Sequence, residues 1–390
     1  MKIFLICGEK SGDNIVCKVL EKLKEELKDS YSEIEFAGIV FNETSEKYGI
    51  KQVFHPKELA VLGIGDIIFN LANILDKIND TANKVIDFQP DLIISVDAYD
   101  FCIRVVKKIR KIEKQKDKRQ SQIWHIVAPS VWAYWSFRAK VLARYYDRLF
   151  YLLPFETKYF KPFETIRRKD GRGFLSTFIG YPATFQERDG SIMKDSNLIG
   201  ITLGSRKNEI YRHYDLIIAT IIRLKMFNSN LNFAFLVTKE TVEMIKQIFK
   251  DFKNLTFIVD DEEKRQTIQK CALVIAKSGT NNIEIGALGT PMVVYYKTSW
   301  LTYLFAKIFA KIKFINLFNI TLNKQIVPEF VQKHATADNL AGTVVYLLTN
   351  NGLRIQQVDQ INKAISLMQR QDKIYPTDIV VEEIEKRIAR

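Results

Sequence analysis

A carboxylate directly follows an apolar stretch in the N-terminal half of the chain. Residues 92–96 (LIISV) have the composition of a fully buried strand, and Asp97-Ala98-Tyr99-Asp100 come next. Ligands of open α/β sheets collect at the carboxyl ends of strands, so Asp97 is placed to act as a general base on a hydroxyl. The alternative is that an aspartate caps the following helix, a role that suits Asp100 better than Asp97.

A glycine-containing turn follows the first apolar stretch. Residues 8–13 read GEKSGD, in which Gly8 and Gly12 allow a tight turn and Ser11 or Asp13 is placed to cap the next helix. The segment is neither a GxxxxGK[ST] phosphate loop nor a GxGxxG fingerprint. Taken alone, it predicts a capped connection between a strand and a helix.

Aromatic side chains surround a Pro-Ser turn at residues 125–135 (HIVAPSVWAYW). At the end of a strand they could form the wall of a lipid or sugar pocket. The single histidine, His125, lies within an apolar strand pattern and is more simply explained as a core residue.

Two further turns in the second half have features of a nucleotide site. Gly204-Ser205-Arg206 follows one predicted strand, and Ser278-Gly279-Thr280 follows another and precedes a helix that carries Glu284. A glycine-rich turn at a helix start offers N–H groups to a diphosphate, and an arginine adds charge-assisted contacts. A carboxylate one turn further on suits the ribose hydroxyls. Together the turns predict a site for a nucleoside diphosphate.

The elements that must position these residues alternate between strand and helix. The pattern predicts an α/β protein with two doubly wound, parallel-sheet domains and an active site in the cleft between them. The expected domains are 1–185 and 186–350, with helices at 351–390 that pack back on them. The predicted strands are 3–7, 35–40, 92–96, 122–127, 148–152, 198–203, 233–237, 255–259, 273–276 and 292–296, and long helices are expected at 15–27, at 67–88 and from 209.

Composition and charge limit the class of protein. The 390 residues carry a formal charge of +13, which favours an anionic partner, but no zinc-finger or RNP-type motif accompanies the basic run at 104–119. We therefore expect no nucleic acid as partner. The apolar start is too short for a secretory signal peptide, and no uncharged run reaches the roughly 18–20 residues that span a bilayer. The four cysteines form no CxxC pair, which favours a reducing cytoplasm over a disulfide framework or a zinc site.

Two apolar segments have the pattern of a membrane-surface element. Residues 60–75 contain one charged residue, and residues 300–318 (WLTYLFAKIFAKIKFINLF) combine a broad apolar helical stripe with lysines and no acidic residue. Such a helix can lie in a membrane interface, although an ordinary core helix has the same periodicity. The candidate membrane contacts are Ile67, Ile68, Trp300, Phe305, Lys307, Phe309, Lys311 and Lys313.

In their order along the chain, these motifs resemble those of the lipid-A-disaccharide synthases of Gram-negative bacteria. That family has GExSGD, DAPDF, SPSVWAW and LPFE where this chain has residues 8–13, 97–101 (DAYDF), 128–134 (APSVWAY) and 153–156 (LPFE). Its GHP, LPGSR and SGTxxLE resemble residues 180–182 (GYP), 202–206 (TLGSR) and 278–284 (SGTNNIE). Its PMVVxY, LPNxL and VPE resemble residues 291–296 (PMVVYY), 317–319 (LFN) and 327–329 (VPE).

The resemblance implies an inverting glycosyltransferase of the GT-B architecture. Its substrates would be UDP-2,3-diacylglucosamine and 2,3-diacylglucosamine 1-phosphate, and Asp97 would be the general base. No metal or other cofactor is implied, and the second domain has no DxD-like carboxylate pair. The residues that would bind substrate are Glu9, Ser11, Asp100, Ser130 and Trp132, and those that would bind UDP are Arg206, Ser278, Gly279, Thr280, Glu284, Asn319 and Glu329.

Because both substrates carry acyl chains, the resemblance also implies a peripheral location on the anionic, cytoplasmic face of the inner membrane. Two alternatives remain at this point: another GT-B enzyme of UDP-sugars, such as a UDP-N-acetylglucosamine 2-epimerase, and an inactive homologue that binds anionic lipid. A homodimer is one open alternative for the oligomeric state.

Overall fold

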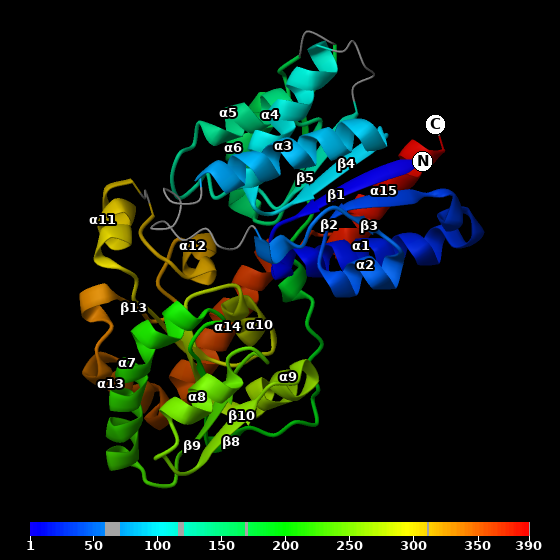
Figure 1. Cartoon of the computed structure of the whole chain (residues 1–390). Helices are drawn as coiled ribbons and strands as arrows, with labels where there is room; N and C mark the ends of the chain where they lie inside the picture. Colours follow the sequence, from blue (N-terminus) through cyan, green and yellow to red (C-terminus); the bar gives the residue numbers. More distant parts are fainter. Residues whose placement is uncertain (59–70, 116–120, 168–170, 310–311, 390) are drawn as a thin grey trace. The chain divides into compact units, whose positions relative to one another are not determined.

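The computed structural model describes residues 1–58, 71–115, 121–167, 171–309 and 312–389, which form two compact units (Figure 1). Unit 1 comprises Met1–Pro182 and Arg370–Arg390, and unit 2 comprises Ala183–Gln369. Where the sequence suggested divisions at 185 and 350, the chain enters unit 2 after Pro182 and returns to unit 1 after Gln369. The last two helices, α14 (Asn351–Met368) and α15 (Pro376–Ile388), therefore belong to different units.

Unit 1 contains a seven-stranded sheet in which every pairing is parallel, in the order β3-β2-β1-β4-β5-β6-β7. All five residues of β4 are buried, as the apolar run predicts for a strand covered on both faces. The strands are β1 (Lys2–Cys7), β2 (Glu35–Ile39), β3 (Lys51–Gln52), β4 (Leu92–Val96), β5 (Gln122–Ile126), β6 (Arg148–Tyr151) and β7 (Leu175–Phe178).

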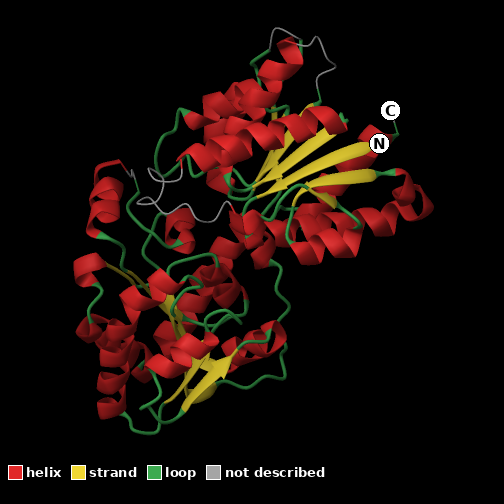
Figure 2. Cartoon of the chain, viewed as in Figure 1, coloured by secondary structure: helices red, strands yellow, loops and turns green. Residues whose placement is uncertain are grey.

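Helices cover both faces of this sheet, because successive strand residues point to opposite sides (Figure 2). Phe4 and Ile6 of β1 belong to the core shared with α3, α4 and α5. Ile3 and Leu5 instead face α1 and α15, where they lie beside Val16. The helices are α1 (Lys10–Leu27), α2 (Asn42–Tyr48), α3 (Leu71–Phe88), α4 (Tyr99–Gln115), α5 (Arg138–Tyr145) and α6 (Thr157–Phe160), together with α15.

Unit 2 repeats the plan with a six-stranded parallel sheet in the order β10-β9-β8-β11-β12-β13. One core cluster joins alternate residues of β8, such as Ile199 and Ile201, to apolar residues of α7, α8 and α13. The strands are β8 (Asp195–Thr202), β9 (Asn232–Leu236), β10 (Leu255–Ile258), β11 (Cys271–Lys277), β12 (Met292–Tyr296) and β13 (Glu329–Val331). The helices are α7 (Lys207–Phe227), α8 (Val242–Ile248), α9 (Asp261–Lys270), α10 (Asn281–Ala287), α11 (Trp300–Phe309), α12 (Leu317–Leu322), α13 (Ala337–Thr349) and α14.

The strand order of each sheet reverses once, between β1 and β4 in unit 1 and between β8 and β11 in unit 2. At such a reversal the two neighbouring strands send their following helices to opposite faces. In unit 1, α1 and α4 lie on opposite sides of the sheet (Figure 1). The carboxyl ends of the strands at such a reversal are where doubly wound folds bind ligands.

The ten strands that the apolar runs predict are confirmed, with ends that differ by a few residues. Three short strands with partly exposed residues, β3, β7 and β13, were not predicted. The helix expected at 67–88 is described from Leu71, and residues 67–70 lie outside the described part of the chain.

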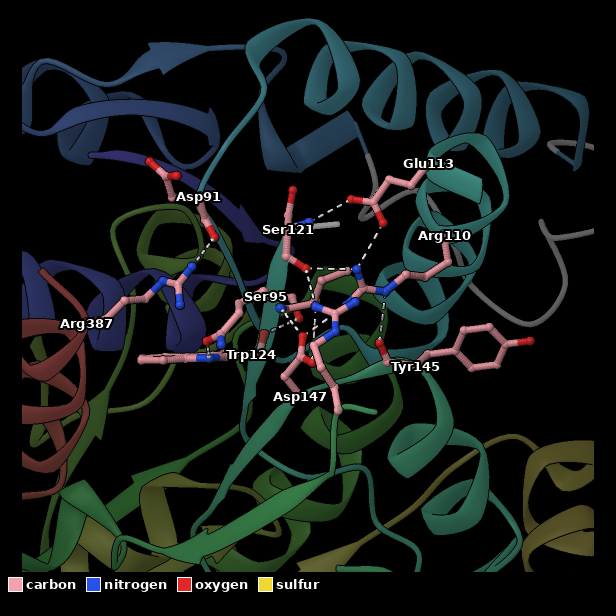
Figure 3. Close-up of polar contacts among 12 residues, drawn as sticks. Asp91, Ser95, Arg110, Glu113, Ser121, Trp124, Tyr145, Asp147 and Arg387 are labelled. Carbon is pink, nitrogen blue, oxygen red and sulfur yellow. Dashed lines mark hydrogen bonds and ion pairs between the residues drawn. The ribbon is translucent and has the colours of Figure 1, made fainter. Parts of the chain in front are cut away.

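A buried ionic cluster fastens α4 to the starts of β5 and β6 (Figure 3). Arg110 of α4 pairs with Glu113 at 2.9 Å and with Asp147 at 3.0 Å. Both carboxylates also accept backbone N–H groups, Glu113 from Ser121 and Asp147 from Ile123. The side chains of Glu113 and Asp147 are 2% and 8% exposed, so water hardly reaches these carboxylates. Arg110 compensates the charge of both, and Arg172 adds a second cation 3.5 Å from Asp147.

Replacing Arg110 by methionine should therefore destabilise unit 1. The change removes the cation that pairs with buried Glu113 and leaves Asp147 with Arg172 alone, at 3.5 Å. Breaking a buried pair in this way costs about 3–5 kcal/mol. Urea unfolding followed by tryptophan fluorescence measures the loss, because three of the four tryptophans lie in unit 1: Trp124, Trp132 and Trp135.

Arg104→Met is the matched control, since Arg104 lies on the same helix with an exposed side chain. An exposed substitution of this kind should change the free energy of unfolding by less than about 0.5 kcal/mol. Equal stability of the two variants would contradict the stabilising role of the cluster.

Candidate active site

The first candidate site lies where the strand order of unit 1 reverses. Cys7 at the end of β1 pairs in register with Val96 at the end of β4, so Gly8 and Asp97 leave the sheet side by side. The two turns are so close that a Cβ atom on residue 8 would lie 2.4 Å from Cβ of Ala98. Only glycine fits at this position, which explains one glycine of the GEKSGD segment.

Asp97 is held in a strained turn beside Gly8. Asp97 and Ala98 both have positive φ angles, 55° and 42°, which are rare for residues with a Cβ atom and cluster at functional sites. The Asp97 backbone N–H donates to the carbonyl of Ile126 at 3.0 Å. Its carboxylate accepts the Ala98 N–H at 2.9 Å, and the Ser11 hydroxyl lies 3.5 Å away.

Burial raises the pKa of Asp97 above its ordinary value, while the N–H of Ala98 and the hydroxyl of Ser11 act in the opposite direction. The burial effect is larger, so this carboxylate is a stronger base than a solvated aspartate. A half-buried, more basic carboxylate at the carboxyl end of a strand in a doubly wound sheet is suited to take a proton from a hydroxyl group.

The remaining residues of the GEKSGD segment differ from the expected cap. Helix α1 begins at Lys10 with Glu9 at its N-cap, and neither Ser11 nor Asp13 caps it. Asp13 is instead completely buried and accepts hydrogen bonds from the Phe41 backbone N–H and the Thr44 hydroxyl. It joins α1 to the start of α2, a role for which the sequence holds no signal. Glu9 and Ser11 are exposed beside Asp97.

The expected cap at Asp100 is also wrong. Asp100 lies inside the first turn of α4, and its carboxylate accepts a hydrogen bond from Arg138 at 2.8 Å. Sequence reasoning did not single out Arg138, the first residue of α5. Only the folded chain brings it beside Asp100, from 38 positions away.

The aromatic segment after β5 forms a turn at the same edge of the sheet. Trp132 packs edge-on against Phe155 at 5.3 Å between ring centroids, and Ser130 is exposed. Glu156 beside them is 2% exposed, and burial raises its pKa to about 8 although the Leu153 N–H donates a hydrogen bond to it. The turn is therefore anchored to the segment that follows β6.

His125 is a core residue, as the sequence favoured. It is fully buried in β5, its Nδ1 atom lies 2.7 Å from the Ser95 hydroxyl, and burial lowers its pKa to about 3. The ring is therefore uncharged at neutral pH.

The second candidate site lies where the strand order of unit 2 reverses. Thr202 at the end of β8 accepts the Lys277 backbone N–H at 3.0 Å, which ties β8 to β11. The Lys277 ammonium pairs with Glu209 of α7 at 2.8 Å. Gly204 has a φ of 108° and would collide with Glu209 if it carried a Cβ atom. Arg206 is exposed at the N-cap of α7.

The Ser278-Gly279-Thr280 turn leaves fewer N–H groups free for a ligand than the sequence predicted, because two of them bond within the protein. The Gly279 N–H donates to the Asn282 side chain at 2.8 Å, and the Ser278 N–H donates to the Tyr295 carbonyl at 2.9 Å. Within the described chain, the N–H groups of Thr280 and Asn281 have no acceptor. Glu284 is exposed one turn further along α10.

Asn319, a predicted nucleotide contact, is hydrogen-bonded within unit 2. It is fully buried, its amide nitrogen donates to the Val327 carbonyl and to Glu329, and its amide oxygen accepts the N–H groups of Ile326 and Val327. All four hydrogen-bonding positions of the amide are used, so Asn319 positions the segment before β13.

Glu329 is only partly buried, yet it too is engaged within unit 2. It accepts the N–H groups of Ile315 and Asn316, and burial raises its pKa although these bonds and the Asn319 amide oppose the change.

The predicted membrane contacts are described only in part. Ile67, Ile68 and Lys311 lie outside the described residues, as do the side chains of Phe305 and Phe309. On α11, Trp300 and Ile308 are 69% and 65% exposed, and Lys307 is exposed, as is Lys313 beyond the helix. In the part of the chain that is described, no helix is long and apolar enough to span a membrane.

Comparison with known proteins assigns the family. The model of the family described as lipid-A-disaccharide synthetase matches residues 3–381 of this chain. The chain is 32% identical over 394 residues to the lipid-A-disaccharide synthase of Rickettsia prowazekii (strain Madrid E), and the match covers 99% of each protein.

Solved structures support the fold. A UDP-GlcNAc 2-epimerase from Neisseria meningitidis bound to UDP-GlcNAc matches with a TM-score of 0.60 and 13% identity, over 99% of this chain and 100% of that one. The calicheamicin glycosyltransferase CalG4 matches with a TM-score of 0.56 and 10% identity, over 100% and 98%. The predicted α/β class with two Rossmann-like units of the GT-B type is confirmed.

Replacing Gly8 by alanine tests the geometry of the first site. The new Cβ atom would lie 2.4 Å from Ala98, so the strained turn at Asp97 must shift. We expect a loss of about 1–3 kcal/mol in the free energy of unfolding, as for other overpacked positions, measured by urea denaturation.

Gly190→Ala is the control, because no atom lies within 4 Å of a Cβ atom placed on Gly190. That change should leave stability unchanged or raise it by up to about 1 kcal/mol. If the two alanine variants were equally stable, the close approach at Gly8 would be wrong.

Proposed function

Because the chain belongs to the lipid-A-disaccharide synthetase family, we propose that it joins two acylated glucosamines. The enzyme is a glycosyltransferase. The proposed donor is UDP-2,3-diacylglucosamine, and the proposed acceptor is the 6-hydroxyl of 2,3-diacylglucosamine 1-phosphate. The products are a β-1,6-linked tetraacyl disaccharide 1-phosphate and UDP.

The observation that carries this proposal is the half-buried, basic carboxylate of Asp97 at the reversal of the first sheet. Asp97 takes the proton of the 6-hydroxyl while that oxygen forms a bond to the anomeric carbon of the donor. The bond from this carbon to the diphosphate oxygen breaks on the opposite face, and UDP leaves with the electron pair. One displacement converts the α configuration to β, so one base is sufficient and no covalent intermediate forms.

Groups of unit 2 are proposed to hold UDP and to stabilise the charge that develops on it. The Arg206 guanidinium and the N–H groups of Thr280 and Asn281 are suited to the diphosphate oxygens. Ser278 and Gly279 shape this turn, and Glu284 is suited to the ribose hydroxyls. Fixed donors of this kind require no rearrangement as the diphosphate becomes more negative.

Asn319 and Glu329 support this site from within unit 2. Asn319 uses all of its amide positions internally, and Glu329 receives three neighbouring N–H donors. We propose that they fix the backbone before and after α12 rather than contact the nucleotide directly.

Residues of unit 1 are proposed to bind the acceptor sugar around Asp97. Glu9 lies in the turn after β1 and Ser11 in the first turn of α1, and Ser130 and Trp132 lie in the turn after β5. β1 and β5 are the two neighbours of β4 in the sheet, so these turns flank the one that carries Asp97.

The acyl chains of both substrates require access to a lipid surface. We propose that the enzyme is peripheral on the cytoplasmic face of the inner membrane and that α11 is one contact. Its exposed Trp300 and Ile308 provide apolar surface, and Lys307 and Lys313 provide charge for anionic lipid.

Replacing Asp97 by alanine should abolish most of the turnover. Loss of a general base slows a reaction roughly 10²–10⁴-fold, measured as disaccharide formation from the two acylated substrates without added metal. Undiminished turnover would show that another residue is the base. No turnover by the wild type despite UDP binding would contradict the proposed transferase activity.

The pH dependence of kcat/KM provides a separate test. Asp97 accepts a proton only when it is ionised, so activity should fall as the pH falls through its pKa. Because burial raises that pKa, the acidic limb should be centred above the ordinary aspartate value of 3.8. A midpoint at or below 3.8, or the same limb in the residual activity of Asp97→Ala, would speak against this assignment.

Membrane docking is tested by reversing the charge of Lys307, Lys311 and Lys313 to glutamate. Each basic residue near an anionic surface contributes about 1 kcal/mol, so vesicle binding should weaken by roughly 100-fold or more. Sedimentation with phosphatidylglycerol vesicles measures it. The control variant reverses the charge of three other exposed lysines of unit 2. They lie in α8 and in the segment after it: Lys246, Lys250 and Lys253. Equal sedimentation of both variants would refute the docking surface.

A further inference from the structure

Arg138, the first residue of α5, is fixed by contacts on three sides. The Arg138 guanidinium lies 4.3 Å from the centre of the Trp135 ring and 5.4 Å from that of Tyr99. It also donates to the Asp100 carboxylate at 2.8 Å. The arginine side chain is only 14% exposed, so its position is set by the protein before any ligand arrives.

The ion pair with Asp100 contributes little to stability. The Asp100 side chain is 67% exposed, and an ion pair with such an exposed partner contributes at most about 1 kcal/mol. Of the five N–H donors of the guanidinium, the contacts within the described chain use one. The other N–H groups of the guanidinium are therefore still available to an anion.

The surroundings of Arg138 suit the headgroup of a lipid. Phe137 is 64% exposed and Trp135 is 37% exposed, so apolar aromatic surface borders the cation. A planar guanidinium stacked on aromatic rings matches the oxygens of a phosphate in a two-pronged geometry, which a lysine cannot provide. The position therefore suits a phosphate attached to an acylated group.

The location also fits the proposed acceptor. Tyr99 and Asp100, which hold Arg138, are the second and third residues after Asp97. In a glucosamine ring, C1 and C5 both flank the ring oxygen, so the phosphate on C1 and the 6-hydroxyl group, which is carried through C6 on C5, leave the ring from neighbouring positions. A base that contacts the hydroxyl thus requires its phosphate-binding partner within the width of one sugar.

We propose that Arg138 binds the 1-phosphate of the acceptor and thereby selects phosphorylated over unphosphorylated acylglucosamine. This inference rests on the proposed function. Asp100 acts as a positioning residue that orients the guanidinium, which replaces the direct substrate contact expected for it from the sequence.

The test compares two acceptors, 2,3-diacylglucosamine 1-phosphate and the same molecule without phosphate, in neutral detergent micelles. The wild type should use the phosphorylated acceptor with a kcat/KM roughly 10- to 100-fold higher, as expected for a charge-assisted contact. In Arg138→Gln this ratio should fall close to one, mainly through a higher KM for the phosphorylated acceptor. Arg138→Lys keeps the charge but loses the fork, so its ratio should be intermediate.

Arg144→Gln is the control, because Arg144 is exposed in the last turn of the same helix. It should keep the wild-type ratio. An unchanged ratio in Arg138→Gln would overturn the proposal, and so would an equal loss with both acceptors, which indicates a structural role only.

Two further outcomes separate the sources of failure. If the wild type transfers to neither acceptor, the proposed function itself fails. If Arg138→Gln binds phosphatidylglycerol vesicles more weakly but keeps the acceptor ratio, the anion is a bulk membrane lipid, which contradicts the proposal.

Discussion

The close approach of two turns at the end of neighbouring parallel strands is the constraint on which the proposed chemistry depends. β1 and β4 pair in register up to Cys7 and Val96, and the next residues diverge to opposite faces of the sheet. The space between them is so small that residue 8 must be glycine. The same contact keeps Ala98, and with it Asp97, in a backbone conformation that a free peptide would avoid. Unit 2 repeats the reversal between β8 and β11, where Gly204 packs against Glu209.

Buried polar contacts hold this strained turn in place. The Asp97 N–H bonds to Ile126 of the neighbouring strand, and the Arg110 cluster fastens the helix that follows Asp97 to the starts of β5 and β6. Asp13, a buried residue of the first turn of α1, joins that helix to the start of α2. A basic carboxylate that is half removed from water is thus supported by charges and hydrogen bonds with defined partners. In the proposed reaction, the sugar nucleotide and the lipid acceptor therefore bind to groups that are already oriented.

Much of the fold could be predicted because fully buried parallel strands are continuous apolar runs, as in LIISV before Asp97. Strands β3, β7 and β13 were missed because they are short and partly exposed. Polar residues were harder to assign. Asn319 occurs in a family motif, yet its amide is used entirely inside unit 2, which only the folded contacts reveal. Arg138 was missed because its partners Asp100 and Tyr99 are distant in sequence, so only the folded chain shows that they meet.

We propose that unit 1 carries the general base and that unit 2 carries the nucleotide-binding groups. Calorimetric titration of UDP into the wild type, Asp97→Asn and Arg206→Gln tests it most directly, with Lys207→Gln as the exposed neighbouring control. Asp97→Asn and Lys207→Gln should bind UDP as tightly as the wild type. Arg206→Gln should bind it roughly 10- to 100-fold more weakly, because a charge-assisted contact to the diphosphate is lost. Weakened binding in Asp97→Asn, or undiminished binding in Arg206→Gln, would contradict the assignment.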